Sequence, residues 1–359
     1  MKFYFAPMEG ITGYVFRNAY QKYFGGIDTY FTPFIASTGL NHKEKNDVLP
    51  AHNEKVHVVP QILTNKAEDF LVIAGKMKDY GYESVNLNLG CPSGTVVSRH
   101  RGAGMLEDTE YLTQFLSEIF EKSPLPVSIK TRIGMRAVEE WEGLLNIFSR
   151  YPIKELIIHP RLQKEFYLGT PHWECYEKAR EVLSCPLCYN GNIDSISAFL
   201  KFQEIFPGEQ SLMIGRGLLK NPWLTQELST QLSGGSDGTD ACGGDIMRDG
   251  FPETDIPEAN NIQRSDAWKA NVQKTVGQKA DLPKWDTLQA FLQELLEQYC
   301  QIMSGEANTL FKLKEIWVYL GEYFLARNPA AEKLLKKIRK AKSVSEYSIA
   351  VAALFRECM

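Results

Sequence analysis

The feature that most constrains the fold of this chain is a repeated alternation of short apolar runs with segments of helical periodicity. Eight runs rich in β-branched residues occur, each followed by a polar loop and then by a helix pattern. Eight strand–helix units imply a closed parallel barrel, so we predict an α/β fold with a TIM (β/α)8 barrel. The predicted strands are residues 2–6, 28–34, 56–61, 84–89, 127–131, 156–159, 187–190 and 212–215.

An open, doubly wound sheet is the competing architecture. Such a sheet normally has fewer strands and carries a glycine-rich dinucleotide fingerprint after its first strand. Here the first predicted strand is followed by Pro7-Met-Glu-Gly10, which is not that fingerprint. Helical patterns in residues 66–78 and 111–120 fit the crossovers of a barrel. The barrel is therefore the preferred interpretation.

The character of the chain changes twice after the eighth unit. Residues 233–284 are rich in Gly, Asp, Ser and Asn, are acidic in their first half, and show weak periodicity, which is typical of a flexible insertion. Helical patterns return in residues 288–299, 310–324 and 331–342. We therefore predict a barrel domain (1–232), an insertion (233–284) and a small helical domain (285–359).

Composition excludes several classes of protein. Hydrophobic residues make up 44% and charged residues 23%, and no apolar run approaches the ~20 residues of a membrane span. The seven cysteines are an odd number, so we expect reduced thiols, a cytoplasmic location and no membrane partner. Cys185 and Cys188 have the C-x-x-C spacing without a second pair, which favours core packing over a metal site. A net charge of -4 argues against a wholly basic protein but permits a local basic patch.

Polar residues follow most of the predicted strands. In a (β/α)8 barrel the catalytic face lies at the carboxyl ends of the strands. Asn190-Gly-Asn192 and Gly215-Arg-Gly217 follow strands seven and eight, where barrels often bind phosphate. Both are also ordinary turn sequences, but their joint position favours a phosphate site. Lys130 and His159 would face the same mouth, and a flavin fits there because a fixed cation stabilises the reduced ring.

Cys91 follows Asn88-Leu-Gly90 at the end of the fourth predicted strand. A thiol is mostly protonated near neutral pH, so Cys91 could act as an acid. Nucleophilic catalysis would need an adjacent base, and no histidine is placed beside Cys91 by the sequence. A buried structural cysteine is the remaining alternative. The Gly-Cys-Pro break at a catalytic-face strand end makes that alternative the weaker one.

Six short blocks, taken in order, resemble the tRNA-dihydrouridine synthases, which are flavin-dependent barrels with a C-terminal helical tRNA-binding domain. Any one block would be a weak signal, but the blocks are dispersed along nearly the whole chain and together are highly specific. The blocks are Ala6-Pro-Met-Glu-Gly-Ile-Thr12; Asn86-Leu-Asn-Leu-Gly-Cys-Pro92 with Arg101-Gly-Ala-Gly104; Ser128-Ile-Lys-Thr-Arg-Ile-Gly134; His159-Pro-Arg161 with Tyr167; Asn190-Gly-Asn-Ile193; and Ile214-Gly-Arg-Gly217.

The resemblance implies FMN as the prosthetic group, NADPH as reductant and a uridine of tRNA as substrate. It implies hydride transfer from flavin N5 to uracil C6, with Cys91 giving the proton to C5. Asn88 would bind the uracil edge, and Arg161 would lie near the substrate. The residues expected to hold FMN are Pro7, Met8, Gln61, Lys130, His159, Asn190, Gly191, Asn192, Gly215 and Arg216.

RNA binding is expected at two places. Residues 333–342 carry six positive charges, with apolar residues at helical spacing, so Lys336, Lys337 and Lys340 would contact tRNA. A solvated amphipathic helix is the alternative. Arg99 and Arg101, near Cys91 in the sequence, could guide the nucleotide. We expect a monomer.

Two rival functions remain open. One is an FMN-dependent barrel reductase acting on a small molecule, which would not require a basic helical domain. The other is a tRNA-binding protein with a vestigial flavin site, which the intact Cys91, Lys130 and His159 argue against.

Overall fold

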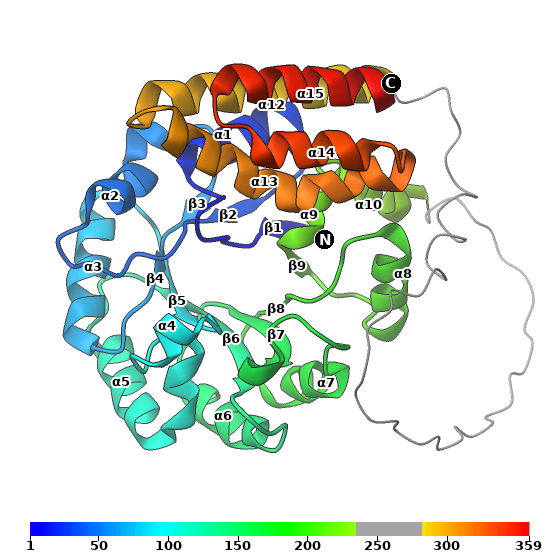
Figure 1. Ribbon diagram of the computed structural model, residues 1–359. Helices are drawn as coiled ribbons and strands as arrows, with labels where there is room; N and C mark the ends of the chain where they lie inside the picture. The colour runs from blue at the N-terminus through cyan, green and yellow to red at the C-terminus, as the bar shows by residue number, and fades with distance from the viewer. Residues whose placement is uncertain (235–281, 359) are drawn as a thin grey trace, which may run out of the picture.

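The computed structural model describes residues 1–234 and 282–358, and Figure 1 shows helices arranged around a central barrel of strands. The predicted insertion, residues 233–284, lies almost entirely outside the described residues.

All strand pairs of the barrel are parallel, in the order β3-β2-β1-β9-β8-β7-β6-β5-β4. Only Pro60 separates β3 from β4, so the two form one broken strand that pairs with β2 on one side and β5 on the other. The sheet is thereby closed with eight strand positions, and the prediction of a (β/α)8 barrel is confirmed. The strands are β1 (Lys2–Phe5), β2 (Thr29–Phe31), β3 (Val58–Val59), β4 (Gln61–Ile62), β5 (Val85–Leu89), β6 (Val127–Gly134), β7 (Leu156–Leu162), β8 (Leu187–Tyr189) and β9 (Ser211–Ile214).

Two strands extend further than the sequence predicts. β6 and β7 stay paired beyond Arg132 and His159 through a register shift that brings Gly134 opposite Leu162. This extension depends on the partner strand and therefore leaves no local signal. β2 is shorter than predicted and ends before Pro33, which has no N–H to donate to a neighbouring strand.

Helices cover the outside of the barrel, and the helices of the C-terminal segment pack along one side of it (Figure 1). The predicted helical segments are all helical, and α15 is a further helix that the sequence analysis did not identify. The barrel helices are α1 (Tyr14–Tyr23), α2 (His42–Val48), α3 (Ala67–Asp79), α4 (Gly94–Val97), α5 (Thr109–Lys122), α6 (Glu140–Phe148), α7 (Trp173–Val182), α8 (Ile196–Ile205), α9 (Arg216–Lys220) and α10 (Leu224–Gly234). The C-terminal helices are α12 (Leu282–Ile302), α13 (Glu306–Arg327), α14 (Ala331–Lys340) and α15 (Val344–Cys358).

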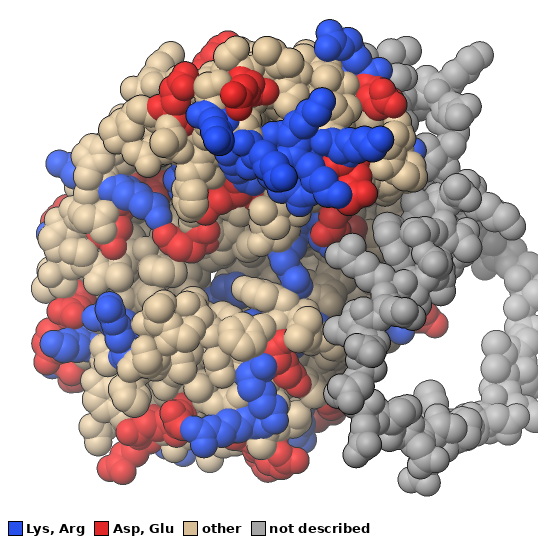
Figure 2. Space-filling view, in the orientation of Figure 1, with Lys and Arg blue, Asp and Glu red and all other residues tan. Residues whose placement is uncertain are grey.

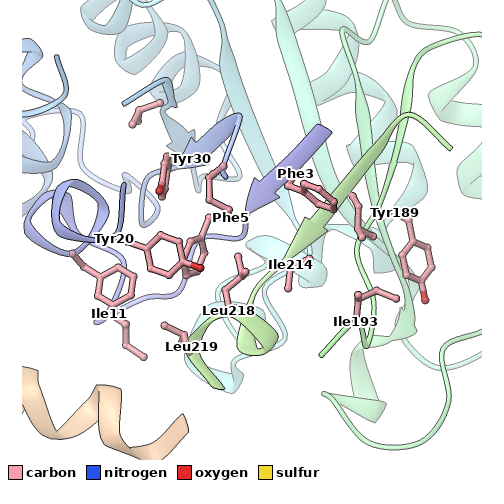
Figure 3. Close-up of a cluster of buried hydrophobic side chains, with 14 of the residues drawn as sticks. Phe3, Phe5, Ile11, Tyr20, Tyr30, Tyr189, Ile193, Ile214, Leu218 and Leu219 are labelled. Carbon is pink, nitrogen blue, oxygen red and sulfur yellow. The ribbon is translucent and has the colours of Figure 1, made fainter. Parts of the chain in front are cut away.

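Side-chain alternation along the strands separates two apolar cores. Phe5 of β1 points outward and packs against Tyr20 of α1, with ring centroids 4.9 Å apart, in the outer cluster of Figure 3. Tyr4, the residue before it, faces the barrel interior together with Cys188 and Met213. Cys188 is thus a buried core residue, as expected for the C-x-x-C segment. Among the described helices, none is long and apolar enough to cross a membrane.

Aromatic side chains attach the C-terminal helices to the barrel. Phe291 of α12 contacts Phe16, Tyr23 and Phe24 of α1 and its following turn, with ring centroids 4.9–6.2 Å apart. These residues belong to one continuous core that includes both the barrel helices and the C-terminal helices. The position of these helices is therefore fixed by apolar packing. The division into separate domains at residues 232 and 285 stays a prediction.

We expect Phe291→Ala to lower the free energy of unfolding by about 3–5 kcal/mol, because Phe291 is 2% exposed and its loss leaves a cavity. Urea titration followed by circular dichroism measures this change. Phe311→Ala on α13 is the matched control, since Phe311 is 63% exposed and its truncation should change stability little. Equal effects of the two substitutions would contradict the proposed attachment.

Candidate functional site

A cavity of about 280 Å³ opens at the carboxyl ends of the barrel strands. The space-filling view of this face shows a hollow at its centre (Figure 2). Twelve of the predicted site residues line the cavity, so the barrel brings together groups that are spread over more than two hundred positions of sequence. They are Pro7, Met8, Gln61, Asn88, Cys91, Lys130, His159, Asn190, Gly191, Asn192, Gly215 and Arg216.

A chain of amide hydrogen bonds inside the barrel positions Cys91. Gln61 Nε2 donates to Asn86 Oδ1 at 2.8 Å, and Asn88 Nδ2 donates to Gln61 Oε1 at 2.7 Å. Asn88 Oδ1 accepts from the backbone N–H groups of Gly90 at 3.1 Å and of Cys91 at 2.9 Å. Since one buried carboxamide holds the turn at the end of β5, Asn88 fixes where the cysteine enters the cavity.

The Cys91 side chain is a thiol in this environment. Burial raises the pKa of Cys91 above its ordinary value, although a backbone hydrogen bond from Ser93 and the charges of Lys130 and Arg132 act in the opposite direction. A raised pKa keeps the proton on sulfur near neutral pH. Cys91 can therefore donate a proton, and the nearby cations favour the thiolate that remains.

Burial and four nearby cations keep His159 neutral. Burial lowers the pKa of His159 well below its ordinary value, and the charges of Arg132, Lys130, Arg161 and Arg216 lower it further. Burial and the charge of Arg132 lower the pKa of Lys130 to about 8, which leaves it mainly protonated at pH 7. The cavity is thus electropositive and suits an anionic ligand or an anionic reaction intermediate.

A smaller hollow of about 190 Å³ adjoins the cavity at the ends of β8 and β9. A Cβ on Gly191 would overlap the hydroxyl of Tyr189, and one on Gly217 would overlap the carbonyl oxygen of Ile193, so close packing requires glycine at both positions. Arg216 lines both hollows. Glycine turns beside an arginine suit a phosphate group, and the assignment of this hollow to the phosphate end of a cofactor stays a prediction.

Arg161 lies behind the cavity wall and is fully buried. Its guanidinium donates to Asn192 Oδ1 at 3.1 Å and to the carbonyl oxygen of Leu168 at 3.0 Å, and lies 3.2 Å from His159 Nε2. These hydrogen bonds hold the cavity wall in place. The predicted contact of Arg161 with substrate stays a prediction.

The remaining predicted residues lie outside the cavity. Arg99 is exposed and Arg101 half-buried just after α4, where Asn65 contacts both residues at 3.2 and 3.5 Å. Lys336, Lys337 and Lys340 line a groove between α14 and α15. Their proposed contacts with RNA are therefore separate from the cavity itself.

The sequence analysis missed several residues that line the cavity. Arg132 lies two residues after Lys130 on β6. Because alternate residues of a strand share a face, this spacing could have indicated that Arg132 also lines the cavity. Its guanidinium donates to the carbonyl oxygen of Gly90 at 3.0 Å. Pro33 and Phe34 follow β2 and are apolar, so a search for polar strand ends could not find them.

Tyr167 is a further wall residue, and it lies between two cations. The guanidinium carbons of Arg216 and Arg132 are 4.4 and 5.4 Å from the centre of the Tyr167 ring. The ring also stacks on His159 at 5.9 Å. Tyr167 therefore closes one side of the electropositive cavity with an aromatic face.

Comparisons with known proteins identify the family of this chain. A family model described as dihydrouridine synthase matches residues 4–242. A protein named probable tRNA-dihydrouridine synthase 2, from Bacillus subtilis, is 30% identical over 230 residues, which are 62% of this chain and 70% of that protein. A probable tRNA-dihydrouridine synthase from Staphylococcus epidermidis is 29% identical over 62% of this chain and 70% of its own. Among solved structures, morphinone reductase is 12% identical with a TM-score of 0.45, covering 64% of this chain and 86% of its own.

The state of Cys91 can be tested directly. We expect alkylation of Cys91 by iodoacetamide to accelerate at a higher pH than alkylation of an ordinary cysteine does, because burial raises the pKa of Cys91. Lys130→Met should move this transition to still higher pH, since the positive charge of Lys130 lowers the pKa of Cys91. Mass spectrometry of the modified peptides against pH gives both curves, with the exposed Cys300 as the internal reference. Fast alkylation of Cys91 at neutral pH would show a thiolate instead.

Proposed function

The chain belongs to the dihydrouridine synthase family of flavin-dependent oxidoreductases, and we propose that it reduces the C5=C6 bond of uridines in tRNA, with FMN as prosthetic group and NADPH as reductant. The observation that carries the proposal is that Cys91, whose pKa is raised by burial, lines the same cavity as the half-buried Lys130.

The residues present fit FMN. Lys130 is half-buried in the cavity wall and acts electrostatically with Arg132, Cys188 and Cys91, so this cation suits an electron-rich ring edge. Arg216 and the glycine turns after β8 and β9 suit the phosphate. When bound, FMN would supply the hydride that is added to uracil C6.

Cys91 supplies the second hydrogen. Addition of hydride at C6 moves the π electrons of the C5=C6 bond into the C5–C4=O system as an enolate. The S–H bond of Cys91 then breaks, its proton forms a bond to C5, and the sulfur retains the electron pair as a thiolate. The charges of Lys130 and Arg132 stabilise this thiolate, which regains a proton from water before the next turnover.

A basic surface on α14 supports tRNA as the substrate. The apolar residues Leu335 and Ile338 are buried, whereas Lys336, Lys337 and Lys340 are exposed on the other side of the helix. Figure 2 shows a concentration of Lys and Arg in the region of α13 and α14, on the same face as the central hollow. A positive surface beside the cavity suits a polyanion whose target base is turned out of its stack. A reductase of free small molecules would not need it.

We expect Cys91→Ala to keep bound FMN and NADPH oxidation but to lower dihydrouridine formation by about 10²–10⁴-fold, which is the usual contribution of a positioned acid. Single-turnover reduction of tRNA, read by mass spectrometry of the nucleosides, measures the effect. Cys300→Ala is the control, because Cys300 is exposed and does not line the cavity. Full dihydrouridine formation by Cys91→Ala would remove the proton-donor role.

Charge reversal of Lys336, Lys337 and Lys340 should weaken tRNA binding and lower the slope of log K against log salt by about 2, because each lost phosphate contact removes counterion release. Binding titrations at several salt concentrations measure both quantities. A charge-matched control reverses Lys122, Lys178 and Lys201, which are exposed on the outer barrel helices α5, α7 and α8. Equal losses in the two triple variants would assign the effect to net charge alone.

A further inference from the structure

Residues 163–172, which we name the rim loop, follow β7 at the edge of the cavity. The loop presents three consecutive large side chains to solvent: Phe166 is 46% exposed, Tyr167 43% and Leu168 77%. Tyr167 lines the cavity, whereas Phe166 and Leu168 do not. Single exposed apolar residues are common, but adjacent ones beside a functional cavity indicate a contact surface.

Buried charged groups hold the backbone of the rim loop in place. Arg132 donates to the carbonyl oxygens of Leu162 at 2.9 Å and Phe166 at 2.6 Å. Arg161 donates to the carbonyl oxygens of Leu168 at 3.0 Å and of Gly169. The loop is therefore tied to two arginines that are almost fully buried.

A second set of bonds closes the base of the loop. Glu165 Oε2 accepts from the backbone N–H of Leu162 at 2.8 Å, and Glu165 Oε1 lies 2.8 Å from His172 Nε2. Phe166 itself has φ 50°, a conformation that a bulky residue rarely adopts. The surrounding bonds thus hold an exposed apolar residue in an unfavourable backbone conformation.

A rigid apolar tip loses little conformational entropy when it binds, so it is suited to recognition. We propose that Phe166 and Leu168 pack against the nucleobases next to the uridine that enters the cavity. The inference rests on the proposed function and adds a second RNA contact surface to it. A uridine drawn into the cavity leaves its neighbours with exposed faces, and apolar or aromatic side chains stack on such faces with little sequence preference.

The charges around the tip favour RNA over a protein partner. Lys164 is exposed on the same loop, and the half-buried Arg216 lies over the Tyr167 ring. Glu165 is the acidic residue of the loop, and its carboxylate faces His172. A phosphate next to a stacked base would therefore meet the exposed cation Lys164 at the rim.

The test uses the full-length protein loaded with flavin. We expect Leu168→Ala combined with Phe166→Ala to lower kcat/KM for tRNA by about tenfold or more, while NADPH oxidation without tRNA stays at the wild-type rate. Because the lost contact is apolar, the salt dependence of tRNA binding should not change, in contrast to charge reversal on α14. The single variant Leu168→Met should keep most of the wild-type kcat/KM for tRNA, since it keeps an apolar side chain at this position.

Leu200→Ala on α8 is the matched control, because Leu200 is 48% exposed on the outside of the barrel. A wild-type protein that forms no dihydrouridine in tRNA would overturn the proposed function itself. An active wild type with an equally active double variant would overturn only the rim-loop inference. Loss of a wild-type dimer in the double variant, with unchanged tRNA kinetics, would instead assign the tip to contact between copies of the chain.

Discussion

The guanidinium of Arg132 joins the two walls of the cavity. It donates to the carbonyl oxygen of Gly90, next to Cys91, and to the carbonyl oxygens of Leu162 and Phe166 at the rim. Burial lowers the pKa of Arg132 to about 10, which still leaves it charged at neutral pH. A buried charge of this kind is tolerated because carbonyl oxygens replace its water. Removing it would leave those carbonyl groups unpaired and release both the thiol turn and the rim loop.

The charge of Arg132 also helps to set the protonation states of the titratable side chains in the cavity. Burial favours the neutral forms of Cys91, Lys130 and His159, and it raises the pKa of the thiol while lowering the pKa values of the amine and the imidazole. The cations oppose burial at Cys91 and reinforce it at His159. As a result, one electropositive cavity contains a protonated thiol and a neutral imidazole. In the proposed reaction, the anion that develops on uracil would draw the proton from this thiol.

Much of this site was predictable because a parallel barrel gathers the carboxyl ends of all its strands at one face. Gln61, Asn88, Lys130 and His159 needed only correct strand ends to be placed together. Arg161 also follows a strand end, yet it turns away from the cavity and holds the rim, and its residue type alone cannot distinguish the two roles. The rim loop is held partly by its own residues Glu165 and His172 and partly by Arg132 of β6, and the contacts of Arg132 leave no signature in the sequence of the loop.

Contacts between the C-terminal helices and the cavity loops fix the position of the basic surface relative to the cavity. Lys312 of α13 donates to the carbonyl oxygen of Gly10, two residues after Met8 of the cavity wall, and Glu322 of α13 lies 2.8 Å from Lys220 of α9. α14, with its exposed lysines, packs on α13. The separation between the basic surface and Cys91 is thus set by packed elements and not by a flexible linker. An RNA bound on that surface would present to the cavity the nucleotides that this fixed separation allows, so the choice of uridine would follow from rigid geometry.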